Sequence, residues 1–273
     1  MLRKWLTCRE RNPSGHKYVV IDVAELIEPD DEVLDQLALE LVLAHGSPRM
    51  IKAELEMLLE DAGEVKLDIL RDYIEKEVLP DGERVATRVG NFGEVLAAGV
   101  LIAFEGFWLP IFKLRFREKR NWAARLTDLC LIKVDDLPRP MVCYGEAKTK
   151  STDCNLQLAV EGHESLAKDD ALANPEILRF ICTWLYETGM YDEAEFISQI
   201  RLGKLDYDKR HDLFLVHNEE CWREEILDNL EDCQLDERLV DFSVKVVLIA
   251  ELRQVIDEVY ARAWLAAGEL LDG

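Results

Sequence analysis

Residues 141–148, Met-Val-Cys-Tyr-Gly-Glu-Ala-Lys, are the stretch on which the interpretation of the fold depends. The apolar run predicts a buried strand, and the strand ends in charged residues. Because side chains alternate along a strand, Glu146 and Lys148 point to one face and Ala147 to the other. Burying a carboxylate and an ammonium is costly unless they pair or bind a metal ion. The stretch therefore predicts a functional pair of charges at the end of a sheet strand.

Two upstream carboxylates can join this pair. Asp128 begins the preceding predicted strand, 126–134, and a hairpin between the two strands would bring it next to Glu146. Glu94 lies in the helix before the sheet and would add a third carboxylate. Such oxygen ligands suit Mg²⁺ or Mn²⁺, and the bound metal would activate water for phosphodiester hydrolysis. We therefore expect Asp128, Glu146 and Glu94 to be metal ligands and catalytic residues, with Lys148 stabilising the developing charge.

The Glu-x-Lys pattern is short, so an alternative stays open. Such a pattern occurs by chance in an acidic chain of this length, and the sequence holds a second copy at residues 64–66, Glu-Val-Lys. The second copy lies between two amphipathic helices with no strand leading into it, which predicts a solvated turn. For Glu146 and Lys148, the alternative is a partly buried ion pair at the edge of a sheet.

A basic segment lies directly before Asp128 in a chain that is otherwise acidic. The sequence has 33 basic and 55 acidic residues, for a net charge of -22, which argues against a free-standing nucleic-acid binder. Residues 113–125 nevertheless hold six cations and one acid, as phosphate contacts require. A strand over 111–116 is the expectation for the start of this segment, and a solvated hairpin is the alternative interpretation of the segment. The residues expected to contact nucleic acid are Arg115, Arg117, Lys119, Arg120 and Lys150.

Hydrophobic periodicity divides the chain at about residue 90. Residues 1–89 are predicted to form a helical N-terminal region, a possible partner or regulatory lobe, and residues 90–273 an α/β domain with C-terminal helices. The predicted helices cover 31–45, 50–61, 67–78, 91–104, 155–172, 176–187, 191–202, 220–232 and 251–271, and the predicted strands 17–25, 111–116, 126–134, 141–147, 213–217 and 242–249.

Several classes of protein are disfavoured by the sequence. The N-terminus lacks the apolar segment of a signal peptide, and no apolar run approaches the length of a membrane span. Seven cysteines at scattered spacings, without a CxxC pair, favour reduced thiols over disulfides or a zinc ribbon. Walker A, GxGxxG and GxSxG motifs do not occur in the sequence. We therefore expect a cytoplasmic protein without membrane contact, in which any use of ATP belongs to a partner.

The candidate residues resemble the motif of a known superfamily. Glu94, Asp128 and the string Glu146-Ala147-Lys148 are similar to the motif of the PD-(D/E)xK nucleases, although Thr127 stands where the motif has proline. More narrowly, Gly93-Glu94, the Asp128 strand and the Gly-Glu-Ala-Lys string resemble the HamA family of the Hachiman antiphage system. The similarity runs from about residue 90 to residue 218.

The resemblance implies a fold, an activity and a partner. The expected fold is a restriction-endonuclease-like core with a helical N-terminal extension, and the expected activity is Mg²⁺-dependent DNA cleavage. Asp128 and Glu146 would hold the metal ion, with Glu94 in the same site, and Lys148 would be the catalytic lysine. Gln157, nine residues after Lys148, would support the site as a glutamine does in some related nucleases. The partner would be a HamB-type DNA helicase that holds the nuclease in check until it meets phage-associated DNA.

Competing functions remain at this point. The first is a metal-dependent deoxyribonuclease whose acidic body relies on a partner for most of its grip on DNA. The second is a nuclease-like module that senses DNA or regulates a helicase without cutting. A nuclease that acts on RNA is a third, because only the family resemblance favours DNA.

Overall fold

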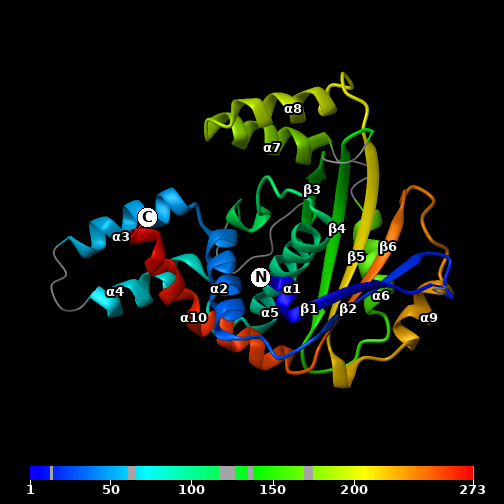
Figure 1. Cartoon of the computed structure of the whole chain (residues 1–273), viewed down its shortest axis with the longest axis horizontal. Coiled ribbons are helices and arrows are strands. Elements are labelled where there is room, and N and C mark those ends of the chain that lie inside the picture. The colour runs from blue at the N-terminus through cyan, green and yellow to red at the C-terminus, as the bar shows by residue number, and fades with distance from the viewer. Residues whose placement is uncertain (13–14, 61–65, 117–126, 135–137, 169–174, 273) are drawn as a thin grey trace.

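The chain forms a mixed α/β structure around one six-stranded sheet (Figure 1). The computed structural model describes residues 1–12, 15–60, 66–116, 127–134, 138–168 and 175–272. The strands are β1 (Leu6–Glu10), β2 (Val19–Glu25), β3 (Leu129–Lys133), β4 (Met141–Lys150), β5 (Asp208–Asn218) and β6 (Phe242–Ile249). The α-helices are α1 (Leu2–Trp5), α2 (Asp31–His45), α3 (Pro48–Leu59), α4 (Lys66–Tyr73), α5 (Val85–Val100), α6 (Leu158–Ala167), α7 (Pro175–Glu187), α8 (Tyr191–Arg201), α9 (Glu225–Glu231) and α10 (Leu252–Asp272).

Four shorter helical segments complete these elements. The π-helical turns Ile74–Val78 and Leu101–Glu105 extend α4 and α5. The 3₁₀ turns are Lys113–Phe116, which precedes β3, and Glu219–Cys221, which follows β5.

The sheet has the strand order β1-β2-β6-β5-β4-β3. Its four central strands are parallel, and the edge strands β1 and β3 pair antiparallel to their neighbours. Parallel strands have helices on both faces, so their sequences are almost continuously apolar. Residues 213–216 of β5 and 246–247 of β6 follow this rule and are fully buried.

Helices cover both faces of this sheet (Figure 1). On one face, α2, α5 and α10 enclose the largest apolar cluster, which includes Cys143, Ala147 and Phe214 of the sheet. On the other face, α6 and α9 pack against Leu213 and Val244. The α7–α8 hairpin forms a separate apolar cluster with β3 and β4, at the top of the view.

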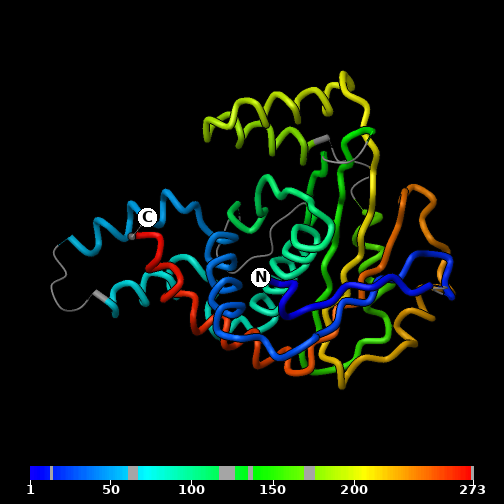
Figure 2. Tube along the Cα trace, in the orientation of Figure 1, coloured from blue at the N-terminus to red at the C-terminus, as the bar shows by residue number. Residues whose placement is uncertain are grey.

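The helices α3 and α4 form a lobe beside the sheet, and the end of α10 lies against them (Figure 2). The helix predicted over 31–45 is confirmed as α2. The Asp30 carboxylate accepts a hydrogen bond from the backbone N–H of Val33, which caps the start of α2. The predicted division at residue 90 stays a prediction, although the apolar cluster contains residues from both sides of it.

The prediction that no apolar run reaches the length of a membrane span needs correction. Residues 85–105, α5 with its π-helical extension, are long and apolar enough to cross a membrane by length and composition. In the structure, most of this segment is buried inside the protein, where α5 packs against β4 and α2. This burial is typical of a core helix, and core helices can also be long and apolar enough to resemble a membrane span.

Other sequence predictions also differ from the structure. The strand predicted over 111–116 is wrong, because residues 113–116 form a 3₁₀ turn. Alternation of charged and apolar residues suggested a strand, yet Lys113 and Leu114 are both buried. The strand β1 was not predicted, and β5 is 11 residues long where 213–217 was expected. The helix expected over 220–232 is a 3₁₀ turn followed by the short α9.

Candidate active site

The hairpin of β3 and β4 brings Asp128 beside the Glu-Ala-Lys string, as the sequence predicted. The two strands pair antiparallel with Leu129 opposite Gly145, which places Asp128, immediately before β3, next to Glu146. Asp128 Oδ2 accepts a hydrogen bond of 3.0 Å from the Ala147 backbone N–H. This bond fixes the carboxylate across the hairpin and leaves its second oxygen directed to other partners.

Glu146 and Lys148 lie on the same face of β4 and pair with each other. Lys148 Nζ donates to Glu146 Oε1 at 2.8 Å and to the hydroxyl of Ser165 in α6 at 3.1 Å. The helix α6 approaches the strand closely at Gly162, where an added Cβ would lie 3.2 Å from Lys148 Cγ. Ser165 was not identified from the sequence, because only the packing of α6 on β4 reveals that it holds the lysine.

Glu94 reaches the same place from α5. Gly93 permits this approach, because a Cβ at this position would lie 1.8 Å from Thr149 Oγ1 in β4. The Lys113 ammonium lies between the two acids, in contact with Asp128 Oδ1 and 3.8 Å from Glu94 Oε1. The structure thus brings Glu94, Asp128 and Lys113 together, and Lys113 is a site residue that the sequence suggested only as part of a basic segment.

Burial and crowding of charge set the electrostatics of this cluster. Desolvation, followed by the charge of Asp128, raises the pKa of Glu146 to about 7, although Lys148 and Lys113 act in the opposite direction. Burial lowers the pKa of the Lys113 ammonium, but the carboxylates of Glu94 and Asp128 more than offset this and leave it above its ordinary value. The cluster therefore holds carboxylates that need positive charge beside them.

The donor chemistry of the cluster suits a hard divalent cation. Glu94, Asp128 and Glu146 supply carboxylate oxygens, which are the ligands preferred by Mg²⁺ and Mn²⁺. Within the described residues, however, no group of three or more His, Cys, Asp or Glu side chains is arranged so that it could hold a metal ion. Lysine ammoniums pair with the carboxylates instead. The residues fit a metal ion in type, and they would bind it only after rearrangement.

The residues expected to contact nucleic acid or to support the site have different outcomes. Arg115 is half-buried and donates from Nε to the Leu43 carbonyl at 2.6 Å, which directs it to the end of α2. Lys150 is half-buried at the end of β4, opposite His217. Gln157 is exposed before α6, and its hydrogen bonds in the described structure come from its backbone. Arg117, Lys119 and Arg120 lie outside the described residues.

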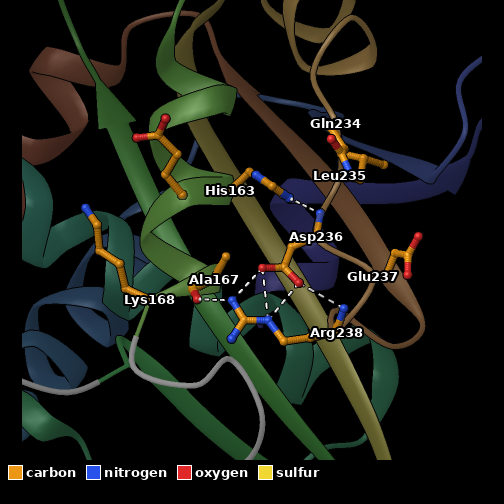
Figure 3. Close-up of a pocket in the computed structure, with 9 residues that line it drawn as sticks. His163, Ala167, Lys168, Gln234, Leu235, Asp236, Glu237 and Arg238 are labelled. Atoms are coloured by element: carbon orange, nitrogen blue, oxygen red, sulfur yellow. Dashed lines mark hydrogen bonds and ion pairs between the residues drawn. The ribbon is translucent and has the colours of Figure 1, made fainter.

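A surface cavity of about 750 Å³ lies along α6 and the loop that precedes β6 (Figure 3). His163 Nε2 accepts the backbone N–H of Asp236 there, and Arg238 forms an ion pair with the carboxylate of Asp236. Burial lowers the pKa of His163, which favours its neutral form. The residues that line this cavity do not include Glu94, Asp128 or Glu146, so we do not assign the cavity to the site that these carboxylates form.

The fold and the cluster define a mixed α/β protein with a buried acid and lysine site at a sheet hairpin. The family model described as HamA matches residues 1–263, so the chain belongs to the HamA family. Membership implies a role in Hachiman antiphage defence, a system that includes a partner helicase. No curated protein matches the chain.

Proposed function

We propose that this chain is a metal-dependent deoxyribonuclease with a PD-(D/E)xK core, the effector of a cytoplasmic defence complex with a HamB-type DNA helicase. The observation that carries this proposal is the hairpin that places Asp128 across from Glu146, with Lys148 on the same face as Glu146. Membership in the HamA family and the seven free cysteines agree with it.

The carboxylates and the lysine have separate tasks in the proposed phosphodiester hydrolysis. Glu94, Asp128 and Glu146 would hold Mg²⁺ or Mn²⁺, which supplies a polarised phosphate and an activated water when bound. Lys148 is held by Glu146 and Ser165, so its ammonium has a fixed direction from which to stabilise developing negative charge. This arrangement requires no covalent nucleophile.

The charge of the chain favours a partner that supplies most of the contact with DNA. A net charge of -22 repels a phosphate backbone, and Lys113, Arg115 and Lys148 near the site are engaged within the protein. A helicase that grips DNA would bring the backbone to the cluster against this repulsion. We therefore propose that cleavage by the complex exceeds cleavage by the isolated chain.

Cleavage assays test the proposed activity. Plasmid and linear DNA, with RNA as a third substrate, are incubated in Mg²⁺ with the chain alone and with its helicase partner. The wild type is compared with Glu146→Gln and Lys148→Met, and Glu64→Gln in the second Glu-x-Lys string is the matched control. We expect cleavage of DNA that both site variants lose and the control retains. Cleavage that survives both site substitutions would refute the assignment of the site.

A non-cleaving module is the second candidate function. The observation that favours it is the lack of a ready-made metal site among the described residues. Such a module would bind DNA or regulate the helicase with no measurable affinity for Mn²⁺. Mn²⁺ binding that is lost in Asp128→Ala would exclude this candidate.

A further inference from the structure

Lys113 is a buried cation placed between two of the carboxylates that would hold the metal ion. Its side chain is 8% exposed, and those of Glu94 and Asp128 are 13% and 12% exposed. The carboxylates approach Lys113 from α5 and from the start of β3, so the ammonium is enclosed by elements distant in sequence. An ammonium in this position neutralises charge that would otherwise be buried without a partner.

The hydrogen bonds of Asp128 show which of its oxygens a metal ion would need. Oδ2 accepts the Ala147 backbone N–H, and Oδ1 contacts Lys113. A cation bound by Asp128 through Oδ1 and by Glu94 would occupy the space of the ammonium. Two cations held between the same two carboxylates would lie at contact distance and repel each other, so the ammonium and a metal ion compete for this space.

The 3₁₀ turn that carries Lys113 is anchored on both sides of the cluster. Arg115 donates to the Leu43 carbonyl near the end of α2 at 2.6 Å. Phe116 packs edge-on against Phe180 and Trp184 of α7, with ring centroids 4.6 Å and 5.1 Å apart. These contacts hold Lys113 in the cluster and connect its position to α2 and α7.

We propose that Lys113 is an internal counter-ion that competes with the divalent metal for Glu94 and Asp128, so that metal binds when the turn 113–116 moves away. This inference rests on the proposed function, because it requires a metal site. Only the state with Lys113 displaced binds metal, so the apparent affinity is reduced by the fraction of molecules in that state. Contacts at α2 or α7 that loosen the turn would raise this fraction.

Mn²⁺ binding to the full chain, followed by electron paramagnetic resonance of the free ion, tests the competition without measuring cleavage. We expect Lys113→Met to bind Mn²⁺ about tenfold or more tightly than the wild type, because the competing cation is gone. Phe116→Ala leaves the cluster intact and loosens the anchor, so it too should bind more tightly, by about threefold. Lys133→Met, at the other end of β3, removes the same charge and is the control for a general electrostatic effect.

Thermal unfolding with and without Mn²⁺ gives a second readout. Mn²⁺ should raise the Tm of Lys113→Met by more than that of the wild type, because the metal replaces the missing counter-ion. If the wild type binds Mn²⁺ and neither Lys113→Met nor Phe116→Ala binds it more tightly, the competition is refuted while the metal site stands. If no variant binds Mn²⁺, the competition and the proposed metal site both fail. If Lys113→Met does not fold even with Mn²⁺, the Mn²⁺ affinity of Phe116→Ala tests the competition: tighter binding than the wild type supports it, and unchanged binding refutes it.

Discussion

Glu146→Gln should change how the stability of the protein depends on pH. Burial and the neighbouring Asp128 raise the pKa of Glu146 from 4.5 to about 7, so the folded protein holds this proton more tightly than the unfolded chain. The associated stability is fully present below the unfolded pKa and is lost as pH rises to the folded pKa. Glutamine does not titrate, so the variant does not lose this stability as the pH rises.

The size of the effect follows from the shift in pKa. Each pKa unit corresponds to about 1.36 kcal/mol, so the full shift from 4.5 to about 7 amounts to about 3.4 kcal/mol. Between about pH 5 and about pH 8, the wild type should lose about 2.5 kcal/mol relative to the variant, because part of the titration lies below that interval. Carboxylates distant from Glu146 are common to both proteins and cancel in the comparison.

Urea unfolding in the presence of EDTA measures this difference. The EDTA removes divalent metal ions, which would otherwise alter the titration. The free energy of unfolding of the wild type and of Glu146→Gln is determined at both pH values. Glu56→Gln, an exposed carboxylate of α3, is the matched control and should track the wild type at both. A difference between wild type and Glu146→Gln that stays constant with pH would refute the reasoning. A difference of opposite sign would mean that Lys148 and Lys113 outweigh burial.

Further predictions concern packing, buried charge and the position of Lys148, the proposed catalytic lysine. Gly93→Ala should destabilise the protein by about 1–3 kcal/mol in urea unfolding, because the new Cβ would lie 1.8 Å from Thr149 Oγ1. Lys245→Met should cost about 3–5 kcal/mol, because the fully buried Lys245 ammonium lies 2.8 Å from the equally buried carboxylate of Asp212. Ser165→Ala should lower kcat for DNA cleavage about tenfold with little change in KM, because the lysine loses one of its two hydrogen-bond partners.

Controls separate these causes from general effects of substitution. Gly90→Ala meets no atom within 4 Å and should cost under about 0.5 kcal/mol, and Lys204→Met removes an exposed charge with a similarly small cost. Adding Thr149→Ala to Gly93→Ala should recover stability, since it removes the clashing hydroxyl. Equal losses in Gly90→Ala and Gly93→Ala would contradict the close approach of α5 to β4. A loss of folding in Ser165→Ala would mean that the serine supports the packing of α6 and not only the lysine.

The predictable part of the fold is the part that local patterns determine. Both the helix 31–45 and the strand 242–249 were predicted with the bounds of α2 and β6, because caps or apolar runs mark their ends. The strand β1 offers only Leu6 and Cys8 as alternating apolar residues, which is too short a pattern to predict a strand. It becomes a strand by pairing with β2, which is a tertiary effect.

In the candidate site too, local sequence patterns predict some side-chain positions and miss those that tertiary contacts determine. Alternation along β4 predicted that Glu146 and Lys148 share a face, and the hairpin placed Asp128 beside them. Lys113 alternates with apolar residues in the same manner and therefore suggested a strand with an exposed basic face. The uncompensated charge of Glu94 and Asp128 favours a different outcome: a buried ammonium beside two partly buried carboxylates is more stable than any of the three alone. Periodicity identifies the face of an element, whereas the attraction between charges on distant elements decides whether a lysine points to solvent or into the site.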